Sequence, residues 1–336
     1  MINAVTFGDL AQSFLLQRRG ADLKAEMTRL NEELVTGQVS DVKSVLAGNV
    51  GYLTGIENDL RLIEGYQVAT REAANFTDAM QTALERVQAA GTGYAQRALV
   101  TAQNGTEPVL DQLAVDARTE LETIISALNT TVGGRTVFGG TATDRSPIAD
   151  VDTLLNELRA ATSAATSVDD IMTAADIWFD GATGFSDTVY TGADTPLNPF
   201  RLADGESVFV GVTAEDQALR DVIKTVALSA LADDMTLPLS VEQKRDLLHR
   251  SATDLLGYQD GLTALRAGVG AAQERIDQLQ TRGNAQSTSL EYAKGALLNA
   301  DPYETATKLE EVQFQLQSLY TVTARMSDLS LVNFVR

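Results

Sequence analysis

Few residues in this chain of 336 could do chemistry. His249 is the only histidine and there is no cysteine, so a cysteine–histidine pair, a thiolate metal site and a disulfide are impossible. We interpret His249, which stands between Arg245 and Arg250 in a polar stretch, as a solvated helix residue rather than a general base. Trp178 and Phe179 are expected to anchor a small apolar core rather than to stack on a ligand.

Two further patterns resemble ligand sites but fit them poorly. The glycine-rich run 133–140 has neither the GxxxxGK[ST] spacing of a P-loop nor the GxGxxG order, so we interpret it as a tight turn from a helix to a strand. Asp180, Asp187 and Asp194 fall in a Gly/Thr-rich stretch, but their spacing does not match a calcium-binding EF-hand loop. We therefore expect no metal site, no cofactor and no enzyme activity.

The composition excludes several classes of partner. A net charge of −20 leaves no basic surface of the kind that nucleic acids or anionic membranes require. No stretch approaches the roughly 20 apolar residues of a membrane span, and the first residues lack the basic leader and apolar core of a secretory signal peptide. We therefore expect a cytoplasmic protein or one that is exported without cleavage.

Two heptad-spaced stripes, one near each end of the sequence, carry the strongest signal. Alternating spacings of three and four residues on a helix are typical of coiled coils. Asp301, Pro302 and Glu304 form a helix-start signal before the second stripe. The first stripe is Leu16, Gly20, Leu23, Met27, Leu30 and Leu34. The second is Leu309, Val312, Leu316, Leu319, Thr323 and Met326, followed by Leu329, Leu331, Val332 and Phe334. We predict that the apolar members form an assembly interface, partly with each other and partly with other chains.

Gly37 ends the helix that carries the first stripe, and periodicity predicts further long helices between the two stripes. Ser240 with Gln243 forms a capping box at the start of the last of these. The expected helices cover residues 8–36, about 54–101, about 109–128, 217–231 and 240–298. Aromatic residues make up only 6% of the chain, which suits aliphatic packing of helix on helix.

A change in composition marks a small insertion. Residues 133–216 are rich in Gly, Thr, Asp and Pro, with strands expected at 136–138, 188–191 and 207–212 and helices at 154–165 and 168–179. The expected fold is mainly α, an elongated bundle of long antiparallel helices with coiled-coil termini and a small α+β insertion domain. The N-terminal coiled-coil segment is expected at 1–45 and the C-terminal one at 300–336. The two halves of a helical rod are expected at 46–134 and 216–299, and the small outer domain between them at 135–215.

Several segments resemble the bacterial flagellin superfamily. LEEVQFQLQSLYTVTARMSDLSLVNFVR at the C-terminus, with LRAGVGAAQERID upstream, resembles the C-terminal half of these proteins. LAQSFLLQRRGADLKAEMTRLNEELVTGQ resembles the N-terminal half. VFGGTATDRSPI at 137–148 and the ending LSLVNFV are similar to the hook-associated subfamily found at the hook–filament junction. The Ile-Asn-Thr-Asn opening of filament flagellins is absent, which also favours that subfamily.

The resemblance implies a structural role outside the cell. Similar proteins pass unfolded through the flagellar type III export apparatus, with a chaperone and without a cleaved signal peptide. It implies that the terminal helices pair as an antiparallel coiled coil, and that a ring of copies contacts hook-associated protein 1 on one side and flagellin on the other. Three alternatives stay open, which are a minor filament flagellin, a cytoplasmic signalling coiled coil and an enzyme carried by the insertion.

Overall fold

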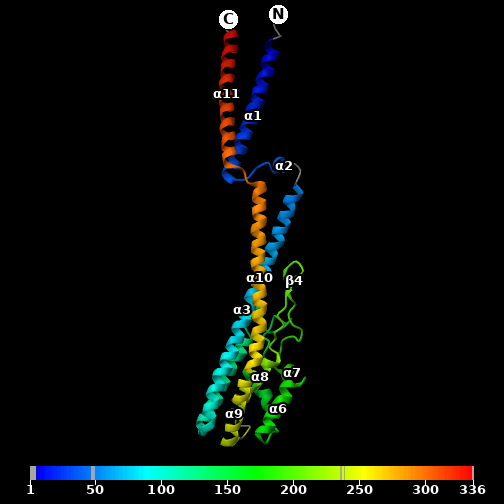
Figure 1. The fold of residues 1–336 in the computed structure, drawn as a ribbon, viewed down its shortest axis with the longest axis vertical. Helices are drawn as coiled ribbons and strands as arrows, with labels where there is room; N and C mark the ends of the chain where they lie inside the picture. The colour runs from blue at the N-terminus through cyan, green and yellow to red at the C-terminus, as the bar shows by residue number, and fades with distance from the viewer. Residues whose placement is uncertain (1–4, 47–49, 235–236, 238, 335–336) are drawn as a thin grey trace. The chain divides into compact units, whose positions relative to one another are not determined.

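The computed structural model describes residues 5–46, 50–234, 237 and 239–334, without the side chains of residues 5–10, 44–45 and 327–334. Long helices dominate it and the strands are short, which confirms the predicted mainly α fold with a small insertion (Figure 1). The chain divides into one unit of residues 1–62 and 285–336 and a second unit of residues 63–284. In the described part of the chain, no helix is apolar over a length sufficient to span a bilayer.

In the first unit, α1 (Val5–Thr36) and α11 (Pro302–Phe334) lie side by side (Figure 1). Asp301 caps α11 as predicted, because its Oδ1 accepts hydrogen bonds from the backbone N–H groups of Tyr303 and Glu304 at 2.9 and 3.1 Å. The unit also holds the short helix α2 (Val42–Val45).

A short backbone pairing joins the adjacent ends of α1 and α11. Gln38 and Asn299 form an antiparallel bridge, flanked by a 2.8 Å hydrogen bond from Val39 N to Leu298 O. Gly37 has a φ of 69°, the left-handed conformation in which glycine ends a helix, and its carbonyl accepts from Ala300 N at 2.9 Å. The pairing fixes the alignment of the two helices at this end.

Two helices, α3 (Val50–Asn104) and α10 (Gln259–Leu298), contribute to both units and run antiparallel within each. In the second unit their side chains form a ladder of hydrogen bonds, in which Gln67 donates to Asn284 at 3.0 Å, Gln273 donates to Asp78 at 2.7 Å and Thr92 donates to Gln259 at 3.0 Å. In the first unit Lys294 Nζ lies 2.9 Å from Glu57 Oε1. The predicted antiparallel pairing of these helices is confirmed.

Three more helices complete the main core of the second unit. They are α4 (Glu107–Leu128), α8 (Gln217–Ala230) and α9 (Val241–Gly257), with a 3₁₀ turn at Leu231–Asp233. The core they share with α3 and α10 is mostly Leu, Ile, Val and Ala, as the low aromatic content predicts. Ser240 and Gln243 cap α9 reciprocally, which confirms the predicted capping box.

The prediction of one helix over residues 240–298 is wrong in one respect. The helix is interrupted at Tyr258, which separates α9 from α10. Gly257 lowers the local helix propensity, and the amide of Gly261 bonds to Tyr258 O in the tighter i to i+3 pattern. A Cβ on Gly261 would lie 3.1 Å from the Cβ of Ala218 on α8, so a glycine here lets the two helices approach closely.

The insertion consists of two small hairpins and three helices. The first hairpin, β1 (Thr131–Val132) and β2 (Arg135–Thr136), turns through Gly133 and Gly134 at φ values of 58° and 79°. The glycine-rich run thus contains a tight turn, although it joins two strands and not a helix and a strand. The second hairpin is β3 (Phe200–Ala203) and β4 (Glu206–Val208). The helices are α5 (Val151–Thr162), α6 (Val168–Asp180) and α7 (Phe185–Thr188).

Two of the insertion's predicted strands need correction. The strand expected at 136–138 ends at Thr136, because β2 covers only Arg135 and Thr136. The strand expected at 188–191 is absent, because residues up to Thr188 form α7 and Tyr190 makes only an isolated bridge with Ile148. Strand β3 was not predicted. Trp178 and Phe179 do anchor a core, since the Trp178 ring meets Phe179 edge-on at 4.8 Å between centroids and Phe179 stacks on Phe185 at 5.2 Å.

The insertion is closed at its neck by the backbone. Ala214 N donates to Phe138 O at 2.9 Å, which joins the segment that leaves the insertion to the segment that enters it. The Asn129 side chain pairs with the backbone of Ile148 as a neighbouring strand does. Its amide donates to Ile148 O at 2.9 Å, and its carbonyl accepts from Ile148 N at 3.0 Å.

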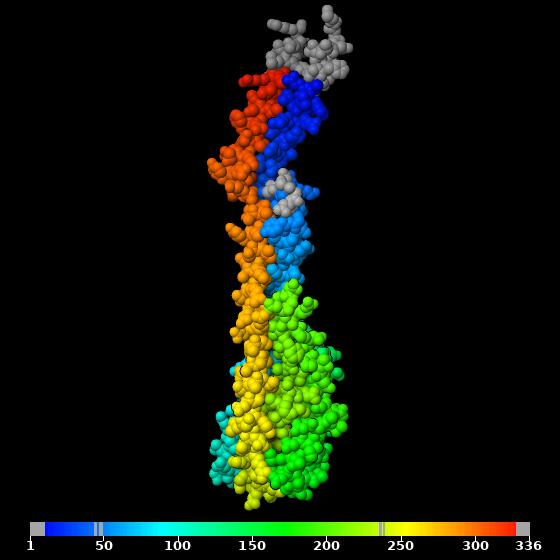
Figure 2. All heavy atoms as spheres, turned by 45° about the vertical axis from the view of Figure 1, so that its right-hand side comes forward, coloured from blue at the N-terminus to red at the C-terminus, as the bar shows by residue number. Residues whose placement is uncertain are grey.

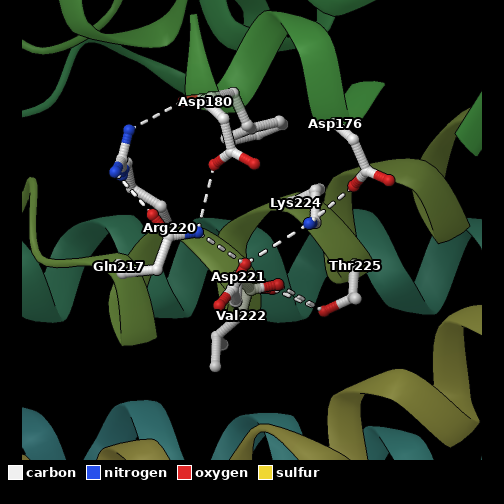
Figure 3. A network of polar contacts seen from close by, with 9 residues as sticks. Asp176, Asp180, Gln217, Arg220, Asp221, Val222, Lys224 and Thr225 are labelled. Atoms are coloured by element: carbon white, nitrogen blue, oxygen red, sulfur yellow. Dashed lines mark hydrogen bonds and ion pairs between the residues drawn. The ribbon is translucent and has the colours of Figure 1, made fainter. Parts of the chain in front are cut away.

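A buried lysine ties the insertion helix α6 to α8 (Figure 3). Lys224 of α8 is 6% exposed, and its Nζ lies 2.7 Å from Asp176 Oδ1 of α6 and 3.3 Å from Asp221 Oδ1. The ammonium also lies 5.6 Å from the ring centroid of Tyr258. Burial by itself lowers the pKa of Lys224. The hydrogen bond from its ammonium to Asp176 and the charges of Tyr258, Asp176 and Asp221 raise the pKa by more than burial lowers it, so the net pKa is above its ordinary value.

Neighbouring side chains extend this contact along α6. Gln217 Nε2 donates to Asp180 at 3.1 Å and to Asp221 at 3.0 Å, and Arg220 Nη1 donates to Phe179 O at 2.8 Å (Figure 3). The end of α6 is therefore held by hydrogen bonds to α8 as well as by its apolar face.

We predict that Lys224→Met destabilises the second unit by roughly 3 kcal/mol, because it leaves the mostly buried Asp221 carboxylate without its cation. Urea unfolding followed by the fluorescence of Trp178, the only tryptophan, measures this. The folded pKa of Lys224 exceeds its unfolded value of about 10.4, so its contribution is present below about pH 10 and is lost as the pH rises through the higher value.

The matched control is Arg118→Met, which removes an ion pair whose arginine side chain is 44% exposed. It should cost less than about 1 kcal/mol. Equal destabilisation by the two variants would contradict a special role for Lys224.

Candidate assembly interface

The two predicted stripes pack on each other. Leu23 and Leu30 of α1 are buried against Leu309 and Val312 of α11. Met27, Leu316 and Leu319 are partly buried around this cluster, which we call the terminal seam. Figure 2 shows the two helices touching along the length that is coloured.

The helices of the terminal seam run in opposite directions. Near the start of α1, the side-chain amide of Gln12 lies 3.9 Å from the sulfur of Met326 late in α11. Near the end of α1, Gln38 pairs with Asn299, which precedes α11. The predicted antiparallel arrangement of the coiled-coil termini is confirmed.

Some predicted members lie outside the buried seam. Leu16 and Met326 are half-buried, while Leu34 is 41% exposed. Next to Leu34, the buried residue is Glu33, whose Oε1 accepts from Arg29 Nη1 at 2.7 Å and from Ser40 N at 3.0 Å. A polar contact thus replaces the apolar stripe at this end of α1. The side chains of Leu329, Leu331, Val332 and Phe334 lie outside the described residues, although their backbone belongs to α11.

The stripe analysis left out exposed apolar side chains that lie on other sides of the two helices. Phe14 on α1 is 64% exposed and Phe314 on α11 is 70% exposed. Each lies two residues from a stripe position, about 200° around the helix, which places it opposite the seam. We use the name outward face for the exposed large apolar side chains of this helix pair, which lie on several sides of the two helices: Phe14, Leu15 and Val35 of α1 with Tyr303, Phe314, Tyr320 and Val322 of α11. For Phe14 and Phe314, the available signal was an apolar residue two positions from the stripe.

The residues considered for catalysis or metal binding do not form a site. His249 lies half-buried in α9, Asp180 ends α6, Asp187 lies in α7 and Asp194 in the loop that follows. Across the described ranges, no group of three or more histidine or carboxylate side chains is arranged to hold a metal ion.

Comparison with known proteins points to one class. Residues 258–335, which include all of α10 and α11, match the family model described as bacterial flagellin C-terminal helical region. The resemblance to the flagellin superfamily is therefore confirmed for this part of the chain. No curated protein sequence gives a match.

Among solved structures, the fold is similar to that in the crystal structure of Bacillus cereus FlgL. The TM-score is 0.52 at 18% identity, and the match covers 72% of this chain and 99% of that one. A putative flagellar hook-associated protein from Vibrio parahaemolyticus matches with a TM-score of 0.49 at 15% identity, covering 73% of this chain and 95% of that one.

We predict that Leu316→Asp with Leu319→Asp separates α1 from α11 in the free chain, because two carboxylates would enter the terminal seam. Limited proteolysis should then trim residues 1 to about 40 and about 300 to 336 at least tenfold faster, while residues 63–284 stay intact. Phe314→Asp is the control, because the same change on the opposite side of α11 should leave the trimming rate unchanged. Equal rates for both variants would sink the prediction.

Proposed function

We propose that this protein is a structural component of the bacterial flagellum at the hook–filament junction. It would link the hook, through hook-associated protein 1, to the flagellin filament, and it would do so as a ring of copies held together by their terminal helices. The observation that carries the proposal is the outward face, a set of exposed apolar side chains on a pair of helices whose inner stripe is already occupied. The FlgL-like fold and the flagellin-like C-terminal region support the flagellar setting.

The outward face supplies a driving force for assembly. Each of its large side chains gains roughly 1.5–3 kcal/mol when fully buried, whereas a free chain leaves these side chains in water. Exposed large apolar side chains on helices whose inner stripe is already occupied are candidates for contact with partners. When the same surface meets a different surface on the next copy, the contacts repeat and close into a ring or continue as a helix.

Charge opposes assembly. Copies that each carry a net charge of −20 repel one another, and salt screens this repulsion beyond about 10 Å at 0.1 M ionic strength. Close apolar contacts must therefore outweigh the repulsion before copies associate. At low concentration the repulsion keeps isolated copies apart.

The proposal includes the location and the export route. By analogy of fold, the chain would leave the cell through the flagellar type III apparatus with the help of an export chaperone and without a cleaved signal peptide. The five segments expected from the sequence remain part of this proposal, with residues 135–215 as the outer domain.

A minor filament flagellin is the second candidate. It is favoured by one observation, which is that the matching family model is that of the flagellin C-terminal region itself. Both candidates use the same seam and outward face, so position on the flagellum distinguishes them.

Electron microscopy of whole flagella labelled with an antibody to residues 140–210 tests the proposed position. We expect a narrow band of label at the hook–filament joint. Label along the filament would establish the flagellin alternative instead. Label confined to the cytoplasm would refute both and favour a signalling coiled coil.

We further predict that Phe14→Asp with Phe314→Asp blocks assembly while the terminal seam stays formed, because the substitutions lie on the outward face. In cells whose own copy of the gene is deleted, the fraction with attached filaments should fall at least tenfold. Gln17→Asp with Gln317→Asp, which adds charge at exposed polar positions of the same helices, should retain attachment. Normal attachment of the Phe14/Phe314 variant would count against the outward face.

A further inference from the structure

One position of the first stripe has no side chain. Gly20 lies between Leu16 and Leu23 in the middle of α1, a helix of 32 residues. Glycine is the weakest helix former after proline, so a glycine in a helix interior needs a packing reason.

A leucine from α11 supplies that reason. A Cβ built on Gly20 would lie 3.3 Å from Leu319 Cδ2, closer than ordinary van der Waals contact. Gly51 and Gly55 of α3 differ, because a Cβ on either would meet nothing within 4 Å. The space beside Gly20 is therefore taken by a side chain of the opposite helix, whereas the space beside the other two is open.

We propose that Gly20 is a positioning residue that receives Leu319 and fixes how closely the outer parts of α1 and α11 approach. At the other end of α1 the Gln38–Asn299 bridge already holds the pair together. Between that bridge and Gly20, Leu23 and Leu30 pack against Leu309 and Val312. Gly20 lies 18 residues from Gln38, about 27 Å along a helix, so its contact with Leu319 acts at the far end of this cluster. The bridge and this contact would be the fixed points at the two ends of the seam.

The consequence concerns the outward face and rests on the proposed function. Phe14 and Leu15 lie beyond Gly20 on α1, and Val322 lies beyond Leu319 on α11. With two fixed points, these side chains keep one spacing across the helix pair. A neighbouring copy can then meet a surface of constant shape. Assembly would not have to order that surface, so it would avoid the entropic cost of doing so.

Spin-label distance measurement tests the proposal on the free full-length chain. Because the chain has no cysteine, labels attach only at introduced ones. Arg18→Cys and Thr321→Cys place labels on exposed positions close to Gly20 and Leu319. In this background we expect one narrow distance. Gly20→Leu should lengthen it by about 2 Å, the range over which side-chain size sets helix separation, and broaden it.

Exchanging the two side chains provides the decisive comparison. Gly20→Leu combined with Leu319→Ala moves the large residue to α1 and the small one to α11, so the distance should return to that of the parent. Restoration would show direct coupling of the two positions. Additive changes, or no change with Gly20→Leu alone, would overturn the proposal. Gly55→Leu is the matched control and should leave the distance unchanged.

Three further outcomes are informative. If Gly20→Leu abolishes the pair altogether, Gly20→Ala should keep it with a smaller lengthening, and no lengthening there would overturn the proposal. A parent chain without a defined distance would overturn it too, since the pair would not exist before assembly. Restored distances in a chain that fails to attach filaments would count against the proposed function alone.

Discussion

The terminal seam is the contact on which the rest of the first unit depends. Leu23, Leu30, Leu309 and Val312 hold together helices of 32 and 33 residues that come from opposite ends of the sequence. Four buried side chains are few for helices of that length, because ordering each backbone residue costs about 1–2 kcal/mol. The pair therefore gains when its outward face is covered, and in an assembly its folding and its association with neighbours become one process.

The second unit does not share this dependence. Its core is continuous over five long helices, and the ladder between α3 and α10 satisfies polar groups on their facing sides. Lys224 adds a charged contact where the insertion meets α8. One chain thus combines a unit with a large core of its own and a unit whose apolar groups are shared between a narrow seam and the surface.

Local signals predicted much of this, and tertiary context explains what they missed. The caps at Asp301 and Ser240 involve neighbours within three residues, so the sequence suffices to find them. The seam follows from heptad spacing, but Leu34 loses its place to Glu33, whose burial depends on Arg29 and Ser40. Residues 188–191 have strand-forming types yet no partner strand, so they form a helix end and a single bridge. The outward face escaped because stripe analysis follows one side of a helix.

A backbone hydrogen bond between Phe138 and Ala214 brings the two ends of the insertion together. The closeness of these two ends does not fix the length of the segment between them, because the entropic cost of closing a loop grows only slowly with the size of the loop. The same helical frame could therefore carry insertions of very different size. Variation in the insertion would then leave the pairing of α1 with α11 unchanged, because that pairing uses residues from the two ends of the sequence.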